Sequence, residues 1–402
     1  MALTLLFDLD DTLLGTNLDA FVPAYFQALA NHLAPYVSPE VMLPALMSGT
    51  QRMMASKDPT RTLREVFDAE FYPRLGLPAE DLREALEKFY DDVFPSLGKL
   101  TRQKPGATSM IRWGIEKGYR ISIATDPFFP LKGTKHRVRW ADLDPEAFEL
   151  ISSFETFHFS KSHPAYYAEF LARLGWPDGP ILMVGNDVER DLIPAQQLGL
   201  ATFQVNGDPA SSRKVEADGY GSLSDLRHWL ESVNLKSLEP KFKNVEAFLA
   251  LMMSTPAALS SLTKDIPPSL WIARPAPTEW SLTEVLCHLR DTEREIHAPH
   301  LQMILTQSDP FLSQPDTHAW AEARGYLSQD GILALGDFIT ARLDALARLK
   351  DLPLDHWSRK ARHSVFGPTN MQETIAFITQ HDRLHIQQIW KILHKFPLVH
   401  SA

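Results

Sequence analysis

Two aspartates near the start of the chain stand at the mouth of a short apolar run. The stretch FDLDDTLLGT (7–16) follows the run 3–7 and contains Asp8, Asp10 and Asp11. Side chains alternate in direction along an extended strand, so we expect Asp8 and Asp10 to point the same way and Asp11 to belong to the turn. Two converging carboxylates repel each other unless a cation lies between them or one is protonated. Oxygen ligands of this kind suit a hard cation such as Mg²⁺.

Further polar residues follow two later apolar runs, and one precedes a helical stretch. They are Thr125 and Asp126 after YRISIA (119–124), Lys161 in FSKSHPAYY (159–167), and Gly185, Asn186, Asp187 and Asp191 in ILMVGNDVERD (181–191). Ligands of open parallel sheets bind beyond the carboxyl ends of the strands, so we expect these groups to meet at one edge. Carboxylates, a hydroxyl and an ammonium group suit a phosphoryl group, whose transfer depends on positioning and charge neutralisation.

These four motifs, in this order, resemble those of the haloacid dehalogenase-like superfamily over residues 1 to about 230. The resemblance implies that Asp8 is the nucleophile that forms an aspartyl-phosphate. It implies that Asp10 protonates the leaving alcohol and then activates water. It also assigns phosphate binding to Thr125, Asp126 and Lys161, and Mg²⁺ binding to Asp8, the backbone carbonyl of Asp10, and Asp187.

Asp10 favours one reaction over another within this family. A halide leaves without a proton, whereas an alkoxide needs one, so an acid two residues after the nucleophile indicates phosphoester hydrolysis rather than dehalogenation. One position departs from the family pattern, because Asn186 stands where many relatives carry aspartate. We expect Asp187 to bind the metal, with Asp191 supporting it or Lys161. If Asn186 occupies the ligand position instead, Mg²⁺ would bind more weakly and turnover would be low.

A second group of residues points to a transition metal. In QHDRLHIQQIW (380–390), His381 and His385 are four residues apart and share one face of a helix. A third imidazole, His288, lies in EWSLTEVLCHLRDTERE (279–295), two turns after a predicted capping box at Ser281. Three imidazoles on facing helices leave a coordination position for water or substrate.

The same segment resembles the DinB-like and YfiT-like superfamily of metal-binding four-helix bundles over about 242–402. The residues that carry this resemblance are Trp280, Ser281, Glu284, His288, His381, His385 and Gln388. The resemblance implies a divalent ion such as Ni²⁺ or Zn²⁺, and several family members are linked to thiol-dependent transfer, isomerisation or hydrolysis. His297 and His300 are rival ligands, although Pro299 lies between them, and we interpret Cys287 as a packing residue.

The elements that must position these residues follow from the apolar pattern. Short apolar runs alternate with helical stretches up to about residue 230, which predicts an α/β fold with a doubly wound parallel sheet. No comparable run lies between Asp8 and Gly106, so we expect a helical cap at about 16–100. After 242 the strand signal disappears, and four helical stretches at 243–264, 281–306, 330–350 and 371–395 predict an all-α bundle. We therefore expect domains at 1–232 and 242–402, joined by a linker at 233–241.

Composition excludes several function classes. The chain has 402 residues, a hydrophobic fraction of 44% and a net charge of −10, so no diffuse basic surface is available for nucleic acid or anionic lipid. The first apolar run ends at Asp8 without a basic segment before it, so we expect no signal peptide. No uninterrupted apolar segment approaches the roughly 18 residues that span a membrane. The lone Cys287 fits a reducing compartment, so we expect a cytoplasmic protein.

Together these patterns predict a Mg²⁺-dependent phosphatase of a small phosphorylated metabolite, fused to a metal-binding bundle. One alternative is a binding or regulatory protein with weak phosphatase activity. Another is a metal-dependent thiol transferase or hydrolase whose main catalytic unit is the bundle. The sequence does not determine the oligomeric state, and a homodimer is the candidate assembly.

Overall fold

The computed structural model describes residues 2–206 and 216–396, and its backbone divides into two compact units. The N-terminal unit contains residues 1–167 and 177–241, and the C-terminal unit contains residues 168–176 and 242–402. The predicted linker, 233–241, contains a short 3-10 helix, η5 (Leu235–Leu238). The predicted domain boundaries stay a prediction, and we describe each unit by itself below.

The N-terminal unit is built on a five-stranded sheet in the order β4-β1-β5-β6-β7, in which all pairs are parallel. Its strands are β1 (Thr4–Phe7), β4 (Arg120–Ile123), β5 (Ile181–Gly185), β6 (Ala201–Val205) and β7 (Gly219–Gly221). The first three coincide with the apolar runs named above, and β6 lies in the segment before residue 230 where strands were expected to alternate with helices, which confirms the fold class. β7 was not predicted, because the sequence GYG has no apolar run.

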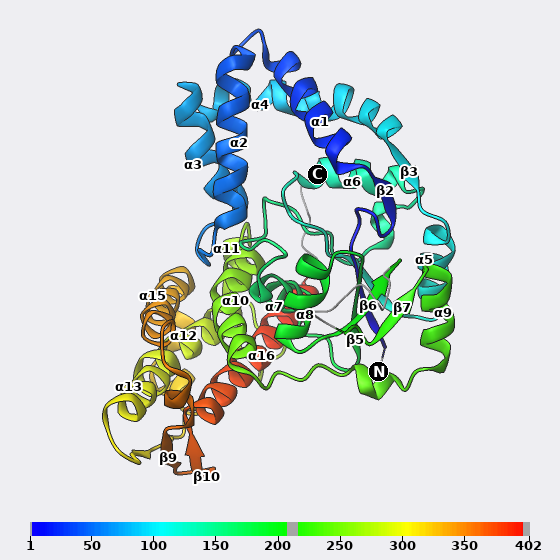
Figure 1. The fold of residues 1–402 in the computed structure, drawn as a ribbon. Helices are drawn as coiled ribbons and strands as arrows, with labels where there is room; N and C mark the ends of the chain where they lie inside the picture. Colours follow the sequence, from blue (N-terminus) through cyan, green and yellow to red (C-terminus); the bar gives the residue numbers. More distant parts are fainter. Residues whose placement is uncertain (1, 207–215, 397–402) are drawn as a thin grey trace. The chain divides into compact units, whose positions relative to one another are not determined.

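Helices cover both faces of this sheet (Figure 1). They are α5 (Ala107–Glu116), α6 (Leu131–Trp140), α8 (Ile193–Leu198) and α9 (Leu223–Ser232), with a 3-10 turn η3 (Pro145–Ala147) and a π-helical turn η4 (Val188–Leu192). Helix α7 (Pro164–Arg173) begins in this unit, and its residues from 168 onward belong to the other. Leu3, Leu5 and Phe7 pack in one apolar core with residues of α5 and α9. Because strand side chains alternate, Asp8 directly after β1 continues the opposite face.

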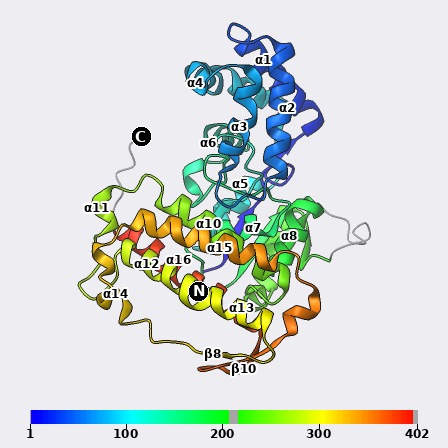
Figure 2. The same cartoon turned by 90° about the vertical axis from the view of Figure 1, so that its left-hand side faces the viewer.

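A helical cap is inserted between β1 and β4. It comprises α1 (Leu18–Leu33), α2 (Pro39–Ala55), α3 (Leu63–Leu75), α4 (Ala79–Lys88), the π-helix η1 (Phe89–Val93) and the 3-10 helix η2 (Phe94–Leu100). Figure 2 shows α1 to α4 grouped together. Two short strands bracket the cap, β2 (Leu14–Thr16) and β3 (Thr101–Gln103), and they pair in antiparallel fashion. The cap has its own core, which is rich in aromatic rings such as Phe21, Tyr25 and Phe94.

The C-terminal unit contains the four predicted long helices. They are α10 (Val245–Thr263), α12 (Leu282–Thr292), α15 (Gly331–Leu349) and α16 (Met371–Lys395). The predicted helix 281–306 continues from α12 through a π-helical turn, η6 (Glu293–His297), into α13 (Ala298–Thr306). The predicted capping box at Ser281 is confirmed, because Ser281 and Glu284 exchange side-chain-to-backbone hydrogen bonds. Four short helices complete the unit: α11 (Pro268–Trp271), α14 (Trp320–Ala323), η7 (Tyr326–Ser328) and η8 (Leu354–Ser358).

The expectation that no strands follow residue 242 is wrong. A three-stranded sheet in the order β10-β9-β8 consists of β8 (Phe311–Leu312), β9 (Lys360–His363) and β10 (Gly367–Asn370). The antiparallel pair β9 and β10 encloses a short turn that ends at Gly367, whose φ of 76° favours glycine. These strands have two to four residues each and contain Lys, Arg, Gly, Pro and Asn, so they lack the β-branched apolar runs that indicate a strand.

Helix α10 is long and apolar enough to cross a membrane by length and composition, and it is the one such helix among residues 2–206 and 216–396. Its sequence contains no uninterrupted apolar run of that length, because Glu246 and several serines and threonines lie among its apolar residues. Of its apolar window, 61% is buried inside the protein. This burial is what a core helix of a bundle requires.

A fully buried ion-pair network crosses the interior of the C-terminal unit. The guanidinium of Arg342 on α15 donates to both carboxylate oxygens of Glu293 at 2.7 and 2.8 Å. It also donates to both carboxylate oxygens of Asp382 on α16, and Asp382 accepts a further bond from Thr255 on α10. The network therefore links four helices through one arginine.

Replacing Arg342 with methionine should destabilise the protein strongly. The change leaves two buried carboxylates without their cation, and breaking a buried pair in this way costs about 3–5 kcal/mol of unfolding free energy. Urea unfolding followed by circular dichroism measures the loss. Arg348→Met is the matched control on the same helix, since Arg348 is exposed and donates to Gln302; it should change the free energy by less than about 0.5 kcal/mol. Equal effects of the two changes would contradict a stabilising role of the network.

Candidate functional site

The first candidate site lies at the carboxyl edge of the parallel sheet and is organised around Lys161. Its ammonium Nζ lies 2.5 Å from Asp8 Oδ1 and also forms an ion pair with Asp191 Oδ1. All three side chains are at most 8% exposed. Asp8 follows β1, Asp191 lies in the turn η4 after β5, and Lys161 precedes α7. The structure thus brings together three predicted residues from separate motifs.

The charges of these three groups are interdependent. Burial raises the pKa of Asp8 above its ordinary value, and the carboxylate of Asp191 raises it further. Burial likewise raises the pKa of Asp191, against the opposing effect of Lys161. Burial disfavours the charged form of Lys161, yet the two carboxylates raise its pKa well above the ordinary value. One ammonium group therefore does not keep both buried carboxyl groups ionised, and the raised pKa of Asp8, about 8, leaves that group largely protonated near neutral pH.

Asp10 pairs with Arg137, a residue that the sequence motifs did not indicate. Asp10 Oδ2 forms an ion pair with the guanidinium of Arg137 on α6, which is almost fully buried. The same guanidinium lies over the ring of Phe129, 4.7 Å from its centroid. This arrangement orients one carboxylate oxygen of Asp10. Its other oxygen, Oδ1, is buried without a hydrogen-bond partner among the described residues.

The remaining predicted residues lie around the same edge. Thr125 is buried after β4, and its carbonyl accepts hydrogen bonds from Ser152 and Tyr166. The carboxylate of Asp126 accepts from the backbone N–H of Lys161 at 3.0 Å and from Arg190 at 2.9 Å. With both its oxygens engaged in this way, Asp126 is better suited to positioning Lys161 than to contacting an anionic phosphate.

Asn186 and Asp187 separate in direction after β5. Asn186 Oδ1 accepts a 3.0 Å hydrogen bond from the hydroxyl of Thr12 in the first motif. The carboxylate of Asp187 caps the turn η4 by accepting from the backbone N–H groups of Glu189 and Arg190, and its side chain is 46% exposed. The side chain of Asp187 is therefore engaged at the turn η4. Asp191, by contrast, is buried and shares Lys161 with Asp8.

The donor set at this edge fits a hard divalent cation. Asp8, Asp191 and Asn186 present oxygen atoms, which are the ligands that Mg²⁺ prefers. The raised pKa of Asp8 means that its ionised form lacks sufficient positive charge nearby, and Asp10 Oδ1 is an unpartnered acceptor, so both favour an added cation. Mg²⁺ sites commonly use one or two carboxylates together with water and substrate phosphate, so this set is sufficient.

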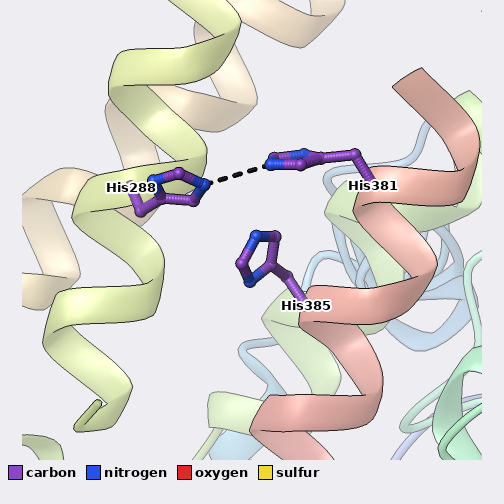
Figure 3. A group of neighbouring side chains, drawn as sticks. All are labelled: His288, His381 and His385. Atoms are coloured by element: carbon purple, nitrogen blue, oxygen red, sulfur yellow. Dashed lines mark hydrogen bonds between the residues drawn. The ribbon is translucent and has the colours of Figure 1, made fainter. Parts of the chain in front are cut away.

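The second candidate site is a group of three histidines in the C-terminal unit (Figure 3). His288 on α12 and His381 and His385 on α16 each offer a ring nitrogen, and these atoms all lie within 4.8 Å of one another. The Nε2 atoms of His288 and His381 are 3.1 Å apart. Ligands of one tetrahedral zinc ion, at bond lengths of about 2.0–2.1 Å, lie roughly 3.3 Å apart. The spacing of the two imidazoles therefore suits a shared metal ion.

All three imidazoles favour the neutral form that binds metals. Burial lowers the pKa of His288 to about 3, and His385 adds electrostatic repulsion. Burial also lowers the pKa of His381, well below its ordinary value, and the pKa of His385. The Nδ1 atom of His385 lies 3.0 Å from Gln388 Oε1, which accepts a hydrogen bond from an Nδ1–H tautomer. This tautomer leaves Nε2 of His385 available as a ligand.

An open groove of about 680 Å³ lies next to the histidines in the same unit. Trp280 forms part of its wall, and the indole ring lies 5.0 Å from the ring of His288 and stacks on His385. Arg274, which pairs with the buried carboxylate of Glu284, and His318 also line the groove. None of the three clustered histidines lines the groove, so Trp280 is the residue that connects its wall to the imidazoles.

The rival ligands have other partners. His297 lies with its ring 5.2 Å from that of His381, but its Nδ1 is 3.0 Å from Glu293. His300 contacts the carbonyl of Ser313. The Cys287 thiol is buried and faces Gln329, and burial raises its pKa to about 11. Among the described residues, none of these three contributes an atom to the group of possible metal ligands that lie within 4.8 Å of one another.

Comparison with known families assigns both halves of the chain. A profile of the haloacid dehalogenase-like hydrolases matches residues 3–199, and a profile of the DinB superfamily matches residues 253–389. Residues 3–199 are a haloacid dehalogenase-like hydrolase domain, and residues 253–389 are a DinB superfamily domain. The chain is a fusion of the two, with the Lys161 cluster inside the hydrolase match and the three histidines inside the DinB match.

Three solved structures illustrate these similarities. The 2-haloacid dehalogenase of Pseudomonas syringae pv. Tomato DC3000 is 22% identical and covers 57% of this chain and 99% of its own, with a TM-score of 0.42. A HAD phosphatase of Thermococcus onnurineus is 20% identical and covers 57% and 98%, with a TM-score of 0.39. YfiT of Bacillus subtilis, which has an unusual four-helix bundle topology, is 18% identical and covers 36% and 83%, with a TM-score of 0.34. A comparison with curated proteins finds no match.

In the DinB domain, replacing Gln388 with alanine should weaken metal binding without removing a ligand. The change frees the tautomer and the ring orientation of His385, and losses of this kind lower metal affinity about 10–100-fold. Competition with a chromophoric chelator for Zn²⁺ measures the affinity. Gln380→Ala is the matched control, since Gln380 is exposed on the same helix. Unchanged affinity in the Gln388 variant would show that the 3.0 Å contact does not orient the ligand.

The residues that the sequence analysis missed are contacts rather than motifs. Arg137 lies in KGTKHRVRW (132–140), a basic helical stretch that resembles a solvated surface, yet its side chain is buried against Asp10. Arg190 lies inside the fourth motif, but no sequence signal joins it to Asp126. Glu293 and His297 pair within the turn η6, and their spacing of four residues, which shares one face of a helix, was the sequence signal that could have joined them.

Proposed function

We propose that the hydrolase domain is a Mg²⁺-dependent phosphatase that acts on a small phosphorylated metabolite through an aspartyl-phosphate on Asp8. The observation that carries this proposal is the buried contact between Asp8 and Lys161, with Asp10 oriented two residues later by Arg137. A carboxylate beside an ammonium group suits attack on an anionic phosphoryl group, because the ammonium offsets the repulsion between them.

The chemistry follows from the two aspartates. A carboxylate oxygen of Asp8 attacks phosphorus, the bond from phosphorus to the alcohol oxygen breaks, and Asp10 gives its proton to that oxygen. Asp10 then accepts a proton from a water molecule, whose oxygen attacks phosphorus and releases inorganic phosphate and the free carboxylate of Asp8. Lys161 holds and neutralises the phosphoryl oxygens during both steps. Bound Mg²⁺ would be held by Asp8 with Asp191, Asn186 or Asp187 and would supply further charge neutralisation.

Steady-state turnover tests this assignment against dehalogenation. The full chain should release phosphate from an aryl phosphate when Mg²⁺ is present and should lose this activity when Mg²⁺ is chelated. It should release no halide from 2-chloropropionate, because Asp10 serves a leaving group that needs a proton. Halide release in the absence of phosphate release would contradict the proposal. The same assay separates a working phosphatase from a binding or regulatory protein that turns substrate over poorly.

For the DinB domain we infer a transition-metal centre, Ni²⁺ or Zn²⁺, held by His288, His381 and His385. The groove favours a second candidate function, a metal-dependent thiol transferase or hydrolase, because Trp280 in its wall also contacts His288 and His385, and three imidazoles leave a coordination position open. Thiol consumption that requires the metal and disappears in His288→Ala would support it. The single cysteine, Cys287, supports a cytoplasmic location for both activities.

A further inference from the structure

A cavity of about 250 Å³ lies between the cap and the sheet-bearing core of the N-terminal unit. Side chains of α1, α2, α3 and α4 form its cap side, and residues 128–130 and 154–155 form its core side. Aromatic rings dominate the lining, among them Tyr25, Phe26, Phe67, Phe71, Phe129 and Phe154. The two sides are joined by backbone bonds, since the N–H groups of Leu63 and Arg64 donate to Phe157 and Phe154 at 2.8 Å.

The polar groups at this cavity are already partnered. Arg64 pairs with Asp68, and Lys132 pairs with Glu87. The carboxylate of Glu155 accepts from the backbone N–H of Leu131. The hydroxyls of Tyr25 and Tyr90 bond to each other at 2.9 Å. A ligand in the cavity would therefore meet apolar surface and satisfied polar groups, which select an apolar molecule over a charged one.

The cavity adjoins the catalytic edge through a short stretch of chain. Thr125 and Asp126 follow β4 at that edge, and Phe128 and Phe129 come directly after them in the cavity wall. The ring of Phe129 also contacts the guanidinium of Arg137, which pairs with Asp10. Arg137 thus touches both the cavity wall and the group that would protonate the leaving alcohol.

We propose that this cavity binds the apolar part of the alcohol in the phosphomonoester substrate, so that the hydrolase domain prefers esters of apolar alcohols to those of sugars or other polyols. This inference rests on the proposed phosphatase function. A dry cavity of about 150 Å³ is large enough to bind benzene, so 250 Å³ accommodates a larger group such as a substituted ring or a medium-length alkyl chain.

A series of n-alkyl phosphates tests the assignment on the unaltered chain with Mg²⁺. Ethyl, butyl, hexyl and octyl phosphate have leaving alcohols of nearly equal acidity, so differences between them report binding rather than reactivity. Each added methylene that enters an apolar site should raise kcat/KM about fourfold, mainly through KM, until the cavity is full. Glycerol phosphate should be a poorer substrate than butyl phosphate.

A pair of phenylalanine substitutions on α2 locates the effect. Thr50 lines the cavity, so Thr50→Phe should fill it and lower kcat/KM for octyl phosphate relative to ethyl phosphate at least about tenfold. Met47 is 61% exposed on the same helix, and Met47→Phe should leave the whole series unchanged. Turnover of ethyl phosphate verifies that each variant is folded, and Leu46→Phe replaces Thr50→Phe if the latter does not fold.

The outcomes separate this inference from the function on which it rests. Turnover of all esters with no dependence on chain length would overturn the cavity assignment and leave the phosphatase proposal intact. Chain-length dependence that persists unchanged in the cavity-filling variant would also overturn it, because the apolar group would then bind elsewhere. Absence of turnover for every ester, with Mg²⁺ and wild-type sequence, would instead overturn the proposed phosphatase function.

Discussion

Asparagine in place of Asp8 is expected to abolish Mg²⁺-dependent hydrolysis of an aryl phosphate, by about 10⁴-fold or more in kcat, as for removal of other covalent nucleophiles. The amide is nearly isosteric with the carboxylate but does not form the acyl phosphate. It also removes one of the two negative charges that surround Lys161. Phosphate release under saturating substrate measures the effect, and mass spectrometry of the quenched wild-type enzyme detects the phosphorylated aspartate.

Asp11→Asn is the matched control for this experiment, because it makes the same chemical change three residues away. Asp11 belongs to the turn, with a φ of 58° that asparagine also adopts, and its side chain accepts from the backbone N–H of Thr16. Activity should be retained there. Asp10→Asn should fall between the two, with a loss of about 10²–10⁴-fold that is smaller for better leaving groups. Full activity of Asp8→Asn would refute the mechanism.

Removing two of the clustered imidazoles should empty the DinB domain of metal. The variant His381→Ala with His385→Ala retains only His288, and one neutral imidazole does not hold a transition metal against dilution and a chelator. Elemental analysis after reconstitution with Zn²⁺ or Ni²⁺ should give about one ion per wild-type chain and almost none in the variant. The substitutions remove two partly buried, uncharged rings, so circular dichroism should confirm that the helices persist.

His394 provides the control on the same helix. It is exposed, and its Nδ1 contacts the carbonyl of Trp390, so His394→Ala should leave the metal content unchanged. A wild-type protein that takes up no metal during reconstitution would exclude the site. Equal loss from the His394 variant would indicate that the ion binds to surface histidines rather than to the cluster.

Much of the catalytic edge could be predicted from sequence, because each of its motifs is local and parallel strands end at one edge. Asp8, Thr125, Lys161 and Asp191 were all named in advance for this reason. The separate orientations of Asn186 and Asp187 could not be predicted. Either side chain could have capped η4 or accepted a bond from Thr12, and only the structure shows that Asp187 forms the cap and Asn186 accepts from Thr12. Arg137 was missed because a buried guanidinium is recognisable only through its distant partner, Asp10.

The bundle shows the same division between local and distant causes. The ends of the four long helices follow from capping residues and apolar spacing, and the structure places them within two residues of the prediction. The network around Arg342 depends on contacts between residues 40 to 127 positions apart, which periodicity does not encode, and the π-helical turn η6 has no signal in the apolar pattern either. The strands β8 to β10 were missed because they are too short and too polar to indicate a sheet.

The ribbon of β2 and β3 bears on how this domain acquires new specificity and how it folds. Thr16 pairs directly with Thr101, so the cap leaves and re-enters the core at neighbouring points. An insert of any length whose ends meet at that spacing could be exchanged there without disturbing β1 and β4, which makes the cap an interchangeable module in evolution. The same arrangement slows assembly of the sheet, because β1 pairs with the edge strand β4 only after the chain has crossed the whole insert, from Thr4 to Arg120.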